Sequence, residues 1–496
     1  MKSPSMYDVP GDVKVGTTRQ RRGRASASRL RSRAGLSRAE RRALVLLGDL
    51  GMVFVAAVLA LALWVIVGQG IAHPLGFLRQ KDIARLFWLV PLWFLLIANL
   101  YDARIVTSKS RNLNGLLVAA GVSLLFYFAI YFSLPPGELP RLVVLFFLVG
   151  LVTLEVGWRM LYIRLMALPS LQQPALVIGA GRAGNSMVKV LSEEVPGHFR
   201  VLGLIDDDPS KKGQVVGGVE VVGGSARLRQ IVEEEEIAVL ILAITGEIQG
   251  DLFQALLDCQ EKGIEIVRMQ TLYEELLSRV PVGYLGADWI MTSFIDSARL
   301  NDLYSPVKRL LDIVGGALGT LVFAILLPFL AMLIHLDSPG PILYQQERAG
   351  KADRPFRMLK FRTMVANAEP DGQARWAAPG DPRVTRPGKF LRKTRIDEIP
   401  QFWNVLRGEM SLVGPRSERP ELVAKLEREI PFYRARLLVR PGLTGWAQVN
   451  YRYGRSVEDA VTKLEYDLYY IRHRSLWLEV RILIRTLGTV LRFQGT

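Results

Sequence analysis

The sequence predicts a membrane protein in three parts: a four-helix transmembrane domain, a small α/β domain, and a C-terminal domain tied to the membrane by one more apolar segment. Three observations predict this fold class. Half of the 496 residues are hydrophobic, which is a high share for a soluble protein. Four long apolar runs precede residue 168, and short apolar strands alternate with amphipathic helices after Pro174.

The first four apolar runs are each near the roughly 20 residues that a helix needs to cross a bilayer. Buried helices of a large soluble core are the alternative, but the runs are consecutive and separated by short polar breaks, which favours membrane spans. Glu155 precedes Arg159 by four residues, so the pattern also predicts a helical ion pair inside the last run. The runs cover residues 43–67, 83–100, 113–134 and 142 to about 166.

Lysine and arginine predict how the spans are oriented, because these residues concentrate in cytoplasmic loops. Residues 1–42 carry ten arginines, and the loop 101–112 carries Arg104, Lys109 and Arg111. We therefore expect a basic cytoplasmic tail over residues 1–42 and a transmembrane domain over 43–168 that returns the chain to the cytoplasm. The tail has no short apolar core before residue 43, so no cleaved signal peptide is expected.

Charge and cysteine content narrow the class of partner. The net charge of +16 fits nucleic acid in principle, but no nucleic-acid motif or interleaved aromatic pattern accompanies it. An anionic membrane surface is the expected partner, and no nucleic acid is expected. The single cysteine, Cys259, excludes intrachain disulfides and a multi-cysteine metal site.

Residues 169–300 predict a small Rossmann-like α/β domain, with strands near 175–178, 200–205, 237–244 and 264–268. Its first turn contains Gly179, Gly181 and Gly184 in the order G-x-G-x-x-G, a pattern that brings backbone amides close to an anionic ligand. The expected ribose-binding acid is absent at its usual distance, because Asp206 and its neighbours come only after the second strand. Nucleotide binding and a purely structural or regulatory role both stay open.

The fifth apolar segment, about residues 308–336, is also long enough to span a membrane. Lys308 and Arg309 stand at its start, before the apolar run that begins at Leu310, and a basic stretch follows it, so both ends are expected in the cytoplasm. Pro328 lies inside the run and removes a helical hydrogen bond. We therefore predict a re-entrant helix that enters one leaflet and returns. An apolar helical pattern over residues 476–493 predicts either an interfacial helix or an ordinary core helix.

Adjacent carboxylates Asp397 and Glu398 lie between Arg392 and Arg416 in the following stretch. Phosphate chemistry needs cations that spread negative charge, a nucleophile or base, and usually a divalent metal held by carboxylates. One short segment supplies all three. The sequence therefore predicts a phosphate-handling site here, with Mg²⁺ as the expected metal.

These residues and several further motifs resemble the bacterial sugar transferases, the polyprenyl-phosphate hexose-1-phosphate transferases known as monotopic phosphoglycosyl transferases. The resemblance is to their large form, with four added spans and a middle domain, and it is strongest from Tyr304 onward. It implies a mostly α-helical catalytic domain over residues 301–496, anchored by the re-entrant helix. The motifs are Lys360-Phe361-Arg362-Thr363-Met364, Pro400-Gln401, Asn404, residues 411–416 and Arg440-Pro441-Gly442-Leu443-Thr444-Gly445.

The resemblance implies a reaction in the bacterial inner membrane, with the catalytic domain facing the cytoplasm. A hexose-1-phosphate passes from a UDP-sugar, expected to be UDP-glucose with UDP-galactose as the alternative, to undecaprenyl phosphate. UMP and undecaprenyl-diphospho-sugar result, as the first step of exopolysaccharide or capsule synthesis. In this scheme Asp397 is the nucleophile, and it holds Mg²⁺ together with Glu398. Phosphate or substrate is bound by Lys360, Arg362, Arg392, Arg416, Gln401 and Asn404.

Two departures from the family pattern, Arg395-Ile396 in place of Ser-Leu and Ser417 in place of Pro, leave the sugar unassigned. A membrane-anchored nucleotide-sugar dehydratase or epimerase is a rival, because Tyr304 and Lys308 have Tyr-x-x-x-Lys spacing; Pro306 between them counts against it. A non-enzymatic scaffold for polysaccharide export is a second rival, which leaves the acid pair unexplained. Whether the chain forms a homo-oligomer stays open.

Overall fold

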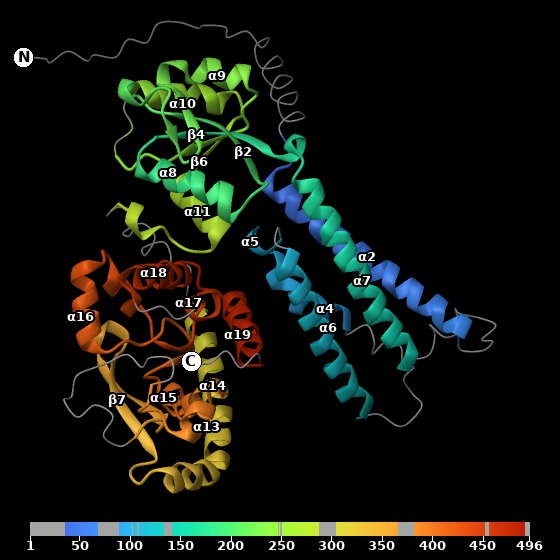
Figure 1. The fold of residues 1–496 in the computed structure, drawn as a ribbon, viewed down its shortest axis with the longest axis vertical. Coiled ribbons are helices and arrows are strands. Elements are labelled where there is room, and N and C mark those ends of the chain that lie inside the picture. Colours follow the sequence, from blue (N-terminus) through green and yellow to red (C-terminus); the bar gives the residue numbers. More distant parts are fainter. Residues whose placement is uncertain are drawn as a thin grey trace, which may run out of the picture. The chain divides into compact units, whose positions relative to one another are not determined.

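The computed structural model describes residues 35–67, 89–101, 103–106, 109–132, 141–246, 248, 250–286, 304–365, 381–451 and 456–491. Contacts divide the chain into two compact units (Figure 1). One unit comprises Met1–Leu44 and Tyr162–Met269, and the other comprises Val45–Leu161 and Gln270–Thr496. The tail predicted over residues 1–42 lies outside the described residues up to residue 34.

Four described helices are long and apolar enough to cross a membrane, and three of them match predicted spans. These three lie in α2 (Arg38–Val67), α6 (Lys109–Phe132) and α7 (Arg141–Met166). The second predicted span is described only from α4 (Leu89–Ile97) onward, a helix of nine residues, and residues 68–88 lie outside the described part. The fourth candidate is the later helix α13. The chain thus has the helices of a membrane protein.

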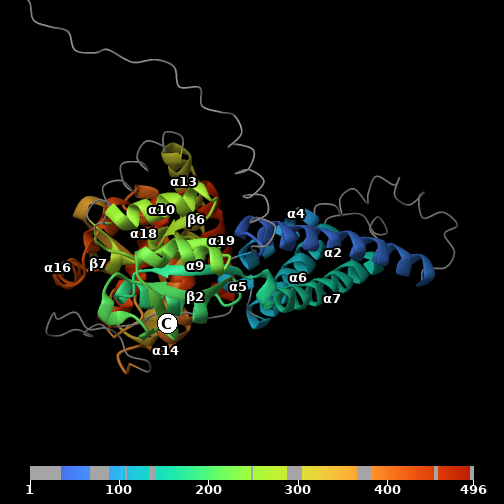
Figure 2. The same cartoon turned by 90° about the horizontal axis from the view of Figure 1, so that it is seen from above.

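The membrane helices pack around a small buried core and keep apolar side chains on the outside. Trp93 of α4 and Leu116 of α6 are buried together, whereas Phe54 and Phe132 are mostly exposed. Figure 2 shows α2, α4, α6 and α7 side by side. Exposed apolar side chains on paired helices suit a lipid environment, where no water needs to be excluded.

A charged cluster is buried inside this bundle. The predicted pair of Glu155 and Arg159 is confirmed, with 3.9 Å between Oε2 and Nε. Arg159 also forms an ion pair with Asp49 of α2, whose carboxylate accepts a hydrogen bond from the Tyr101 hydroxyl at 2.6 Å. The cluster therefore links α7 to α2. The four-residue spacing of Glu155 and Arg159 within one helix did not predict this contact between two helices.

The middle domain is an α/β domain, as predicted. Its six strands follow the order β3-β4-β2-β1-β5-β6, parallel except for the β3–β4 hairpin. Helices α9 (Leu228–Glu234) and α10 (Gly250–Glu261) cover one face of the sheet, and α8 (Arg182–Lys189) covers the other (Figure 1). The strands are β1 Gln173–Ile178, β2 Phe199–Ile205, β3 Val215–Val216, β4 Val219–Gly223, β5 Val239–Leu242 and β6 Glu265–Arg268.

The segment after the sheet packs with the C-terminal unit. Helix α11 (Met269–Leu277) leads to Ser278, whose carbonyl accepts a hydrogen bond from the Trp446 indole at 2.8 Å. The amide of Val280 donates to the carbonyl of Glu465 at 3.0 Å. The contacts thus change unit after Met269, because described residues such as Val280 and Val282 pack into the C-terminal core. The domain boundary at residue 300 stays a prediction.

The C-terminal unit combines helices with two small two-stranded sheets, β7–β8 and β9–β10. Its core surrounds the buried residues Trp446, Tyr470 and Ile482. Its strands are β7 Leu343–Ala349, β8 Pro355–Phe361, β9 Ser411–Val413 and β10 Gly442–Thr444. Its helices are α13 Tyr304–Asp337, α14 Arg386–Thr394, α15 Gln401–Arg407, α16 Pro420–Glu429, α17 Trp446–Asn450, α18 Val457–Arg472 and α19 Leu476–Leu491.

Helix α13 is the most apolar of the candidate spans, and only 6% of its most apolar window is buried. It continues through Pro328 as one helix of 34 residues, where the sequence suggested a break. In Figure 1 the C-terminal part of α13 runs across the direction of its N-terminal part. A proline that removes one hydrogen bond while the flanking turns persist bends a helix in this way.

The N-terminal half of α13 is built into the C-terminal unit by polar contacts. The Asp312 carboxylate accepts hydrogen bonds from the Ser411 hydroxyl and the Leu412 amide, both at 2.9 Å. The Arg309 guanidinium donates to the carbonyls of Val405 and Leu406 at the end of α15, at 2.9 and 2.8 Å. The membrane helix therefore holds β9 and α15 directly.

Candidate active site

The acid pair lies in a single turn between two helices. Asp397 and Glu398 belong to the 3₁₀ turn η9 (Ile396–Glu398), and their side chains are 8% and 9% exposed. Arg395 separates this turn from α14 and has a left-handed backbone with φ 58°. A left-handed residue reverses the chain after a helix, so Arg395 turns both acids into the domain rather than onto its surface.

Three cations from different segments surround Glu398. Arg416, which follows β9, and Lys360 of β8 approach its Oε1 atom at 2.8 and 3.2 Å. Arg395 approaches its Oε2 atom at 3.8 Å. The sequence predicted Lys360 and Arg416 as site residues but not Arg395. Its position three residues before Glu398 was the available signal, since such residues share one face of a helical turn.

Arg392 completes the basic surroundings from α14. Its Nε atom donates to the Thr363 hydroxyl at 2.9 Å, just after β8. Burial lowers the pKa of Arg392, and the charges of Asp397 and Asp381 counteract that effect. We refer to Lys360, Arg392, Arg395 and Arg416 as the cation cluster.

Burial and charge act differently on the two acids. Burial alone opposes the charge of Glu398, but Arg416 and then Lys360 and Arg395 outweigh it and hold the pKa of Glu398 well below its usual range. Burial, together with the negative charge of Glu398, raises the pKa of Asp397 to about 6, against the opposing effect of Lys360, Arg392 and Arg416. Both are carboxylates at neutral pH, and Asp397 is the more basic of the two.

Two predicted substrate-binding residues, Arg362 and Asn404, form hydrogen bonds with the backbone. The Arg362 guanidinium donates to the carbonyls of Ser338 and Pro339, just beyond the end of α13. The Asn404 amide nitrogen donates to the carbonyl of Arg357 at 2.8 Å, and its oxygen accepts from the amide of Leu359 at 3.1 Å. None of the contacts among the described residues joins these two side chains to the acid pair, and their role in substrate binding stays a prediction.

Gln401 lies one helical turn after Asp397, at the start of α15. Its side chain is 3% exposed, and its amide nitrogen has no hydrogen-bond partner among the described residues. A buried unpaired donor is costly unless something else satisfies it. Gln401 therefore keeps its place as a candidate ligand of the substrate.

The acid pair fits a magnesium ion of the kind that nucleotide substrates bring. Magnesium is commonly held by one or two carboxylates together with substrate phosphates, rather than by a complete protein cage. No group of three or more His, Cys, Asp or Glu side chains with metal-binding geometry is present within the described ranges. Asp397 and Glu398 would supply the two carboxylates, and Oε2 of Glu398 is the less crowded oxygen.

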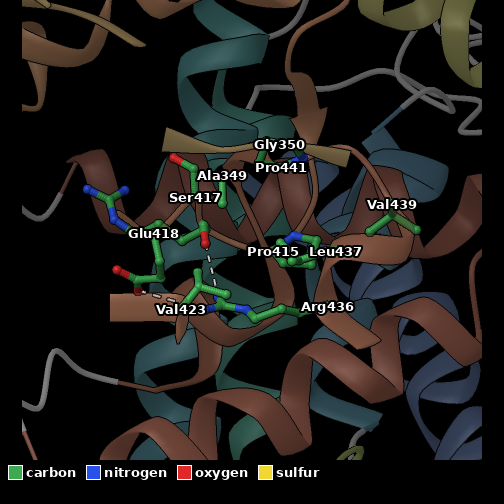
Figure 3. A pocket seen from close by; sticks show the side chains of 11 residues that line it. Ala349, Gly350, Pro415, Ser417, Glu418, Val423, Arg436, Leu437, Val439 and Pro441 are labelled. Atoms are coloured by element: carbon green, nitrogen blue, oxygen red, sulfur yellow. Dashed lines mark hydrogen bonds and ion pairs between the residues drawn. The ribbon is translucent and has the colours of Figure 1, made fainter. Parts of the chain in front are cut away.

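A small pocket is lined by Arg416 and Arg436, together with the other residues labelled in Figure 3. Arg436 donates to the carbonyl of Arg416 at 3.0 Å and pairs with Asp467 at 2.9 Å. Arg348 donates to the carbonyl of Ser417 at 3.1 Å. These contacts hold the backbone of the loop that carries Arg416 and so restrict the position of its guanidinium. The sequence analysis did not assign this role to Arg348 or Arg436.

The residues of the dehydratase rival have a structural task. The Tyr304 hydroxyl and the Lys308 ammonium both bind the Glu479 carboxylate of α19, each at 2.6 Å. Lys308 also donates to the carbonyl of Val413 at 3.0 Å. This pair belongs to a different compact unit from the glycine-rich turn. The described contacts therefore do not assemble a dehydratase site.

Helix α19 packs into the core on one face, while the interfacial role that the sequence left open stays a prediction. Leu478 and Ile482 are buried in the core, whereas Trp477 is 55% and Val480 is 37% exposed. One face of the helix therefore belongs to the core. The other presents apolar side chains outward, as an interfacial helix does.

The glycine-rich turn of the middle domain forms where the sequence predicts it. Gly179 has φ +104°, and a side chain on Gly184 would collide with the Gly179 carbonyl, 1.9 Å from the Cβ position. Asp206, directly after β2, accepts a hydrogen bond from the Ala180 amide at 2.7 Å and pairs with Lys211 at 3.0 Å. Part of the turn is therefore already bound by a carboxylate.

Two family models match separate parts of the chain. Residues 303–493 match the model described as bacterial sugar transferase. Residues 97–269 match the model described as CoA-binding domain. Coenzyme A is anionic, and the Asp206 carboxylate already takes the Ala180 amide, so the turn does not fit a phosphate at that amide. Nucleotide binding by Gly179, Gly181 and Gly184 stays a prediction.

Three curated relatives align with much of the chain. A UDP-N-acetylgalactosamine-undecaprenyl-phosphate N-acetylgalactosaminephosphotransferase of Aeromonas hydrophila is 42% identical over 49% of this chain and 56% of its own length. An undecaprenyl-phosphate glucose phosphotransferase of Komagataeibacter xylinus is 34% identical over 64% and 59%. A UDP-galactose-lipid carrier transferase of Erwinia amylovora is 31% identical over 65% and 69%. The chain thus spans less than two thirds of the first two relatives.

Proposed function

The chain belongs to the bacterial sugar transferase family, and on that premise we propose that it is a phosphoglycosyl transferase. It moves a hexose-1-phosphate from a UDP-sugar to undecaprenyl phosphate, giving undecaprenyl-diphospho-sugar and UMP. The observation that carries the proposal is the buried acid pair of Asp397 and Glu398 under the cation cluster. The names of the three relatives, which describe transfer of a sugar or sugar phosphate to undecaprenyl phosphate or a lipid carrier, support this class of reaction.

In the first step an Asp397 oxygen attacks the phosphorus that bears the sugar. The bond from this phosphorus to the bridging oxygen breaks, UMP leaves with that oxygen, and the sugar phosphate stays on Asp397 as an acyl phosphate. Asp397 suits this role better than Glu398. Its pKa of about 6 leaves it ionised at neutral pH, and it is a stronger base than Glu398. Glu398 is instead neutralised by its cations. A nucleophile needs that reactivity.

The cation cluster stabilises the phosphate group during the attack. Four positive side chains face two carboxylates, so the site keeps an excess of positive charge that matches an anionic diphosphate. Fixed cations in a buried site stabilise developing negative charge without reorganisation. Magnesium, held by Asp397 and Glu398, would supply further charge neutralisation on the same phosphates.

In the second step a phosphate oxygen of undecaprenyl phosphate attacks the same phosphorus. The bond to Asp397 breaks, the carboxylate is restored, and the diphosphate linkage of the product forms. The acceptor is a lipid, so the site must lie at a membrane surface. The exposed apolar surface of α13, its bend near Pro328, and the basic residues at both its ends support a re-entrant anchor at the cytoplasmic face of the inner membrane.

The donor sugar is the finer part of the proposal. We take UDP-glucose as the donor, with UDP-galactose second, for the first step of exopolysaccharide or capsule synthesis. The three relatives act on N-acetylgalactosamine, glucose and galactose donors by name. The donor class is therefore better supported than the individual sugar.

The decisive experiment measures UMP release by purified full-length protein with magnesium, undecaprenyl phosphate and a panel of UDP-sugars. We expect release with one preferred sugar, and loss of at least about 10³-fold in Asp397→Asn, because the nucleophile is removed. Asp353→Asn is the matched control, since Asp353 is a half-exposed carboxylate of the same unit. Folded wild-type protein that releases no UMP from any donor would refute the proposal and favour a scaffold.

A further inference from the structure

One face of α14 is basic and aromatic along its whole length. Arg386, Lys389, Phe390 and Lys393 recur at a spacing of three and four residues, so they lie on the same side of the helix. All four side chains are exposed, Phe390 by 57%. We refer to these four residues as the α14 basic face.

The opposite side of α14 connects the membrane helix to the reaction site. Leu391 is fully buried against Ile334 of α13 and Phe361 of β8. Arg392 turns inward, where its guanidinium interacts with the charge of Asp397. Nearby turns of α13 leave apolar side chains such as Met332 and Leu336 mostly exposed. The basic face therefore belongs to a helix that packs beside the proposed membrane anchor.

The charge pattern of this face is one-sided. It contains three cations and no acid, and the side chains of Arg386, Lys389 and Lys393 make no ion pair with any residue the structure describes. The exposed surface of α16, in the same unit, carries Lys425 and Arg428 mixed with three glutamates. Mixed charge is typical of a solvated face, whereas cations beside an exposed aromatic residue are typical of contact with lipid phosphates.

We propose that the α14 basic face binds the phosphate headgroup of the acceptor lipid and delivers it to Arg392 and Asp397. The proposal rests on the function proposed above. Lys393 follows Arg392 directly in α14, about 100° further round the helix, so the same turn carries an exposed cation and the arginine that faces the reaction site. Of the lipids present, only the acceptor has to bring its phosphate from the α14 basic face to Asp397. The acceptor is therefore favoured over the bilayer phospholipids as the ligand of this face.

The test uses full-length protein in phosphatidylcholine nanodiscs, with undecaprenyl phosphate as the sole anionic lipid. The variant is Lys389→Gln combined with Lys393→Gln, and the matched control is Lys425→Gln combined with Arg428→Gln on α16. We expect the KM for the acceptor to rise by about 10- to 30-fold in the variant. The control should stay within about twofold of wild type.

Two further measurements separate this proposal from its premise. UMP release from the donor without acceptor reports the first step alone, and it should be unchanged in the variant; its absence in wild type would instead refute the proposed function. The rise in melting temperature on adding undecaprenyl phosphate without donor reports acceptor binding directly, and we expect the variant to lose most of it.

An unchanged acceptor KM and an unchanged melting shift in the variant would overturn the proposal. An equal loss in the α16 control would also overturn it, because any surface cation would then serve. Weaker activity of the variant only in discs containing anionic phospholipid would assign the face to the bulk bilayer instead. A larger KM effect at low salt than at high salt would support direct contact with a charged headgroup.

Discussion

Asp397 and Asp467 are buried carboxylates of the same unit, and burial raises the pKa of each to about 6. Their surroundings differ in the balance of charge. Arg436 pairs with Asp467 at 2.9 Å and with Glu418 at 3.8 Å, and Arg348 approaches the other oxygen of Glu418 at 3.8 Å. Two guanidiniums therefore match these two carboxylates. Asp397 and Glu398 face the four side chains of the cation cluster. A surplus of positive charge, rather than a displaced pKa, distinguishes a site that receives phosphate from a structural brace.

The sharpest way to break this comparison is to remove the acid of the brace. Asp467→Asn leaves the buried Arg436 without its closest charged partner, and we expect a loss of about 3–5 kcal/mol in the unfolding free energy. Thermal melting of purified protein measures it, with Asp353→Asn as a half-exposed control. UMP release per folded molecule should fall much less than stability. A catalytic defect without destabilisation would place Asp467 in the reaction instead.

Removing one cation from the reaction site should lower the reaction rate and leave the stability of the fold nearly unchanged. Arg416→Gln takes away the closest cation of Glu398, at 2.8 Å, and we expect kcat/KM for the donor to fall by about 10²–10³-fold. The melting temperature should change little, because the Arg416 side chain is 29% exposed. Steady-state kinetics with the preferred UDP-sugar provide the measurement. Equal damage to stability and rate would show that Arg416 is also a brace.

The pH dependence of UMP release should also distinguish Asp397 from Asp467. The pKa of Asp397 is raised to about 6, and the attacking form is the carboxylate. UMP release should therefore fall about tenfold per pH unit as the pH drops below that value. Asp467→Asn, assayed at a temperature where it stays folded, should keep this acidic limb. A limb near the ordinary aspartate pKa of about 4 would show that bound magnesium or substrate lowers the value in the working enzyme.

The smallest expected effect concerns Arg395, whose left-handed backbone is strained for any residue except glycine. Arg395→Gly should relieve that strain and stabilise the fold by about 1 kcal/mol, although it removes the third cation around Glu398. We expect a slightly higher melting temperature together with a several-fold higher KM for the donor. Arg395→Ala, which keeps the strain but loses the charge, is the control. A lower melting temperature in the glycine variant would contradict this assignment.

Sequence reasoning predicted the parts of the site that local motifs encode. Asp397, Glu398, Lys360, Arg392 and Arg416 converge in the structure as the motifs implied. Their chemical roles stay predictions, because geometry alone does not demonstrate a reaction.

The remaining differences arise from contacts distant in sequence. Arg362 and Asn404 lie in the same motifs, but both donate hydrogen bonds to backbone carbonyls of other segments. No local sequence pattern predicts such partners. Arg395 was noted as a departure from the family, yet its left-handed backbone could not be read from an arginine. In α13 the turns on both sides of Pro328 outweigh the helix-breaking tendency of proline, so helix continuity was also missed.

The contacts of α13 have a consequence for anyone who wishes to crystallise or screen the catalytic part in water. Asp312 and Arg309, which look like parts of a removable anchor, hold the strand and helix beside the acid pair. Deleting the whole of α13 would therefore take away one wall of the domain together with the exposed apolar surface. A soluble version has to keep the first half of α13 and replace its exposed leucines by polar residues, rather than begin after it.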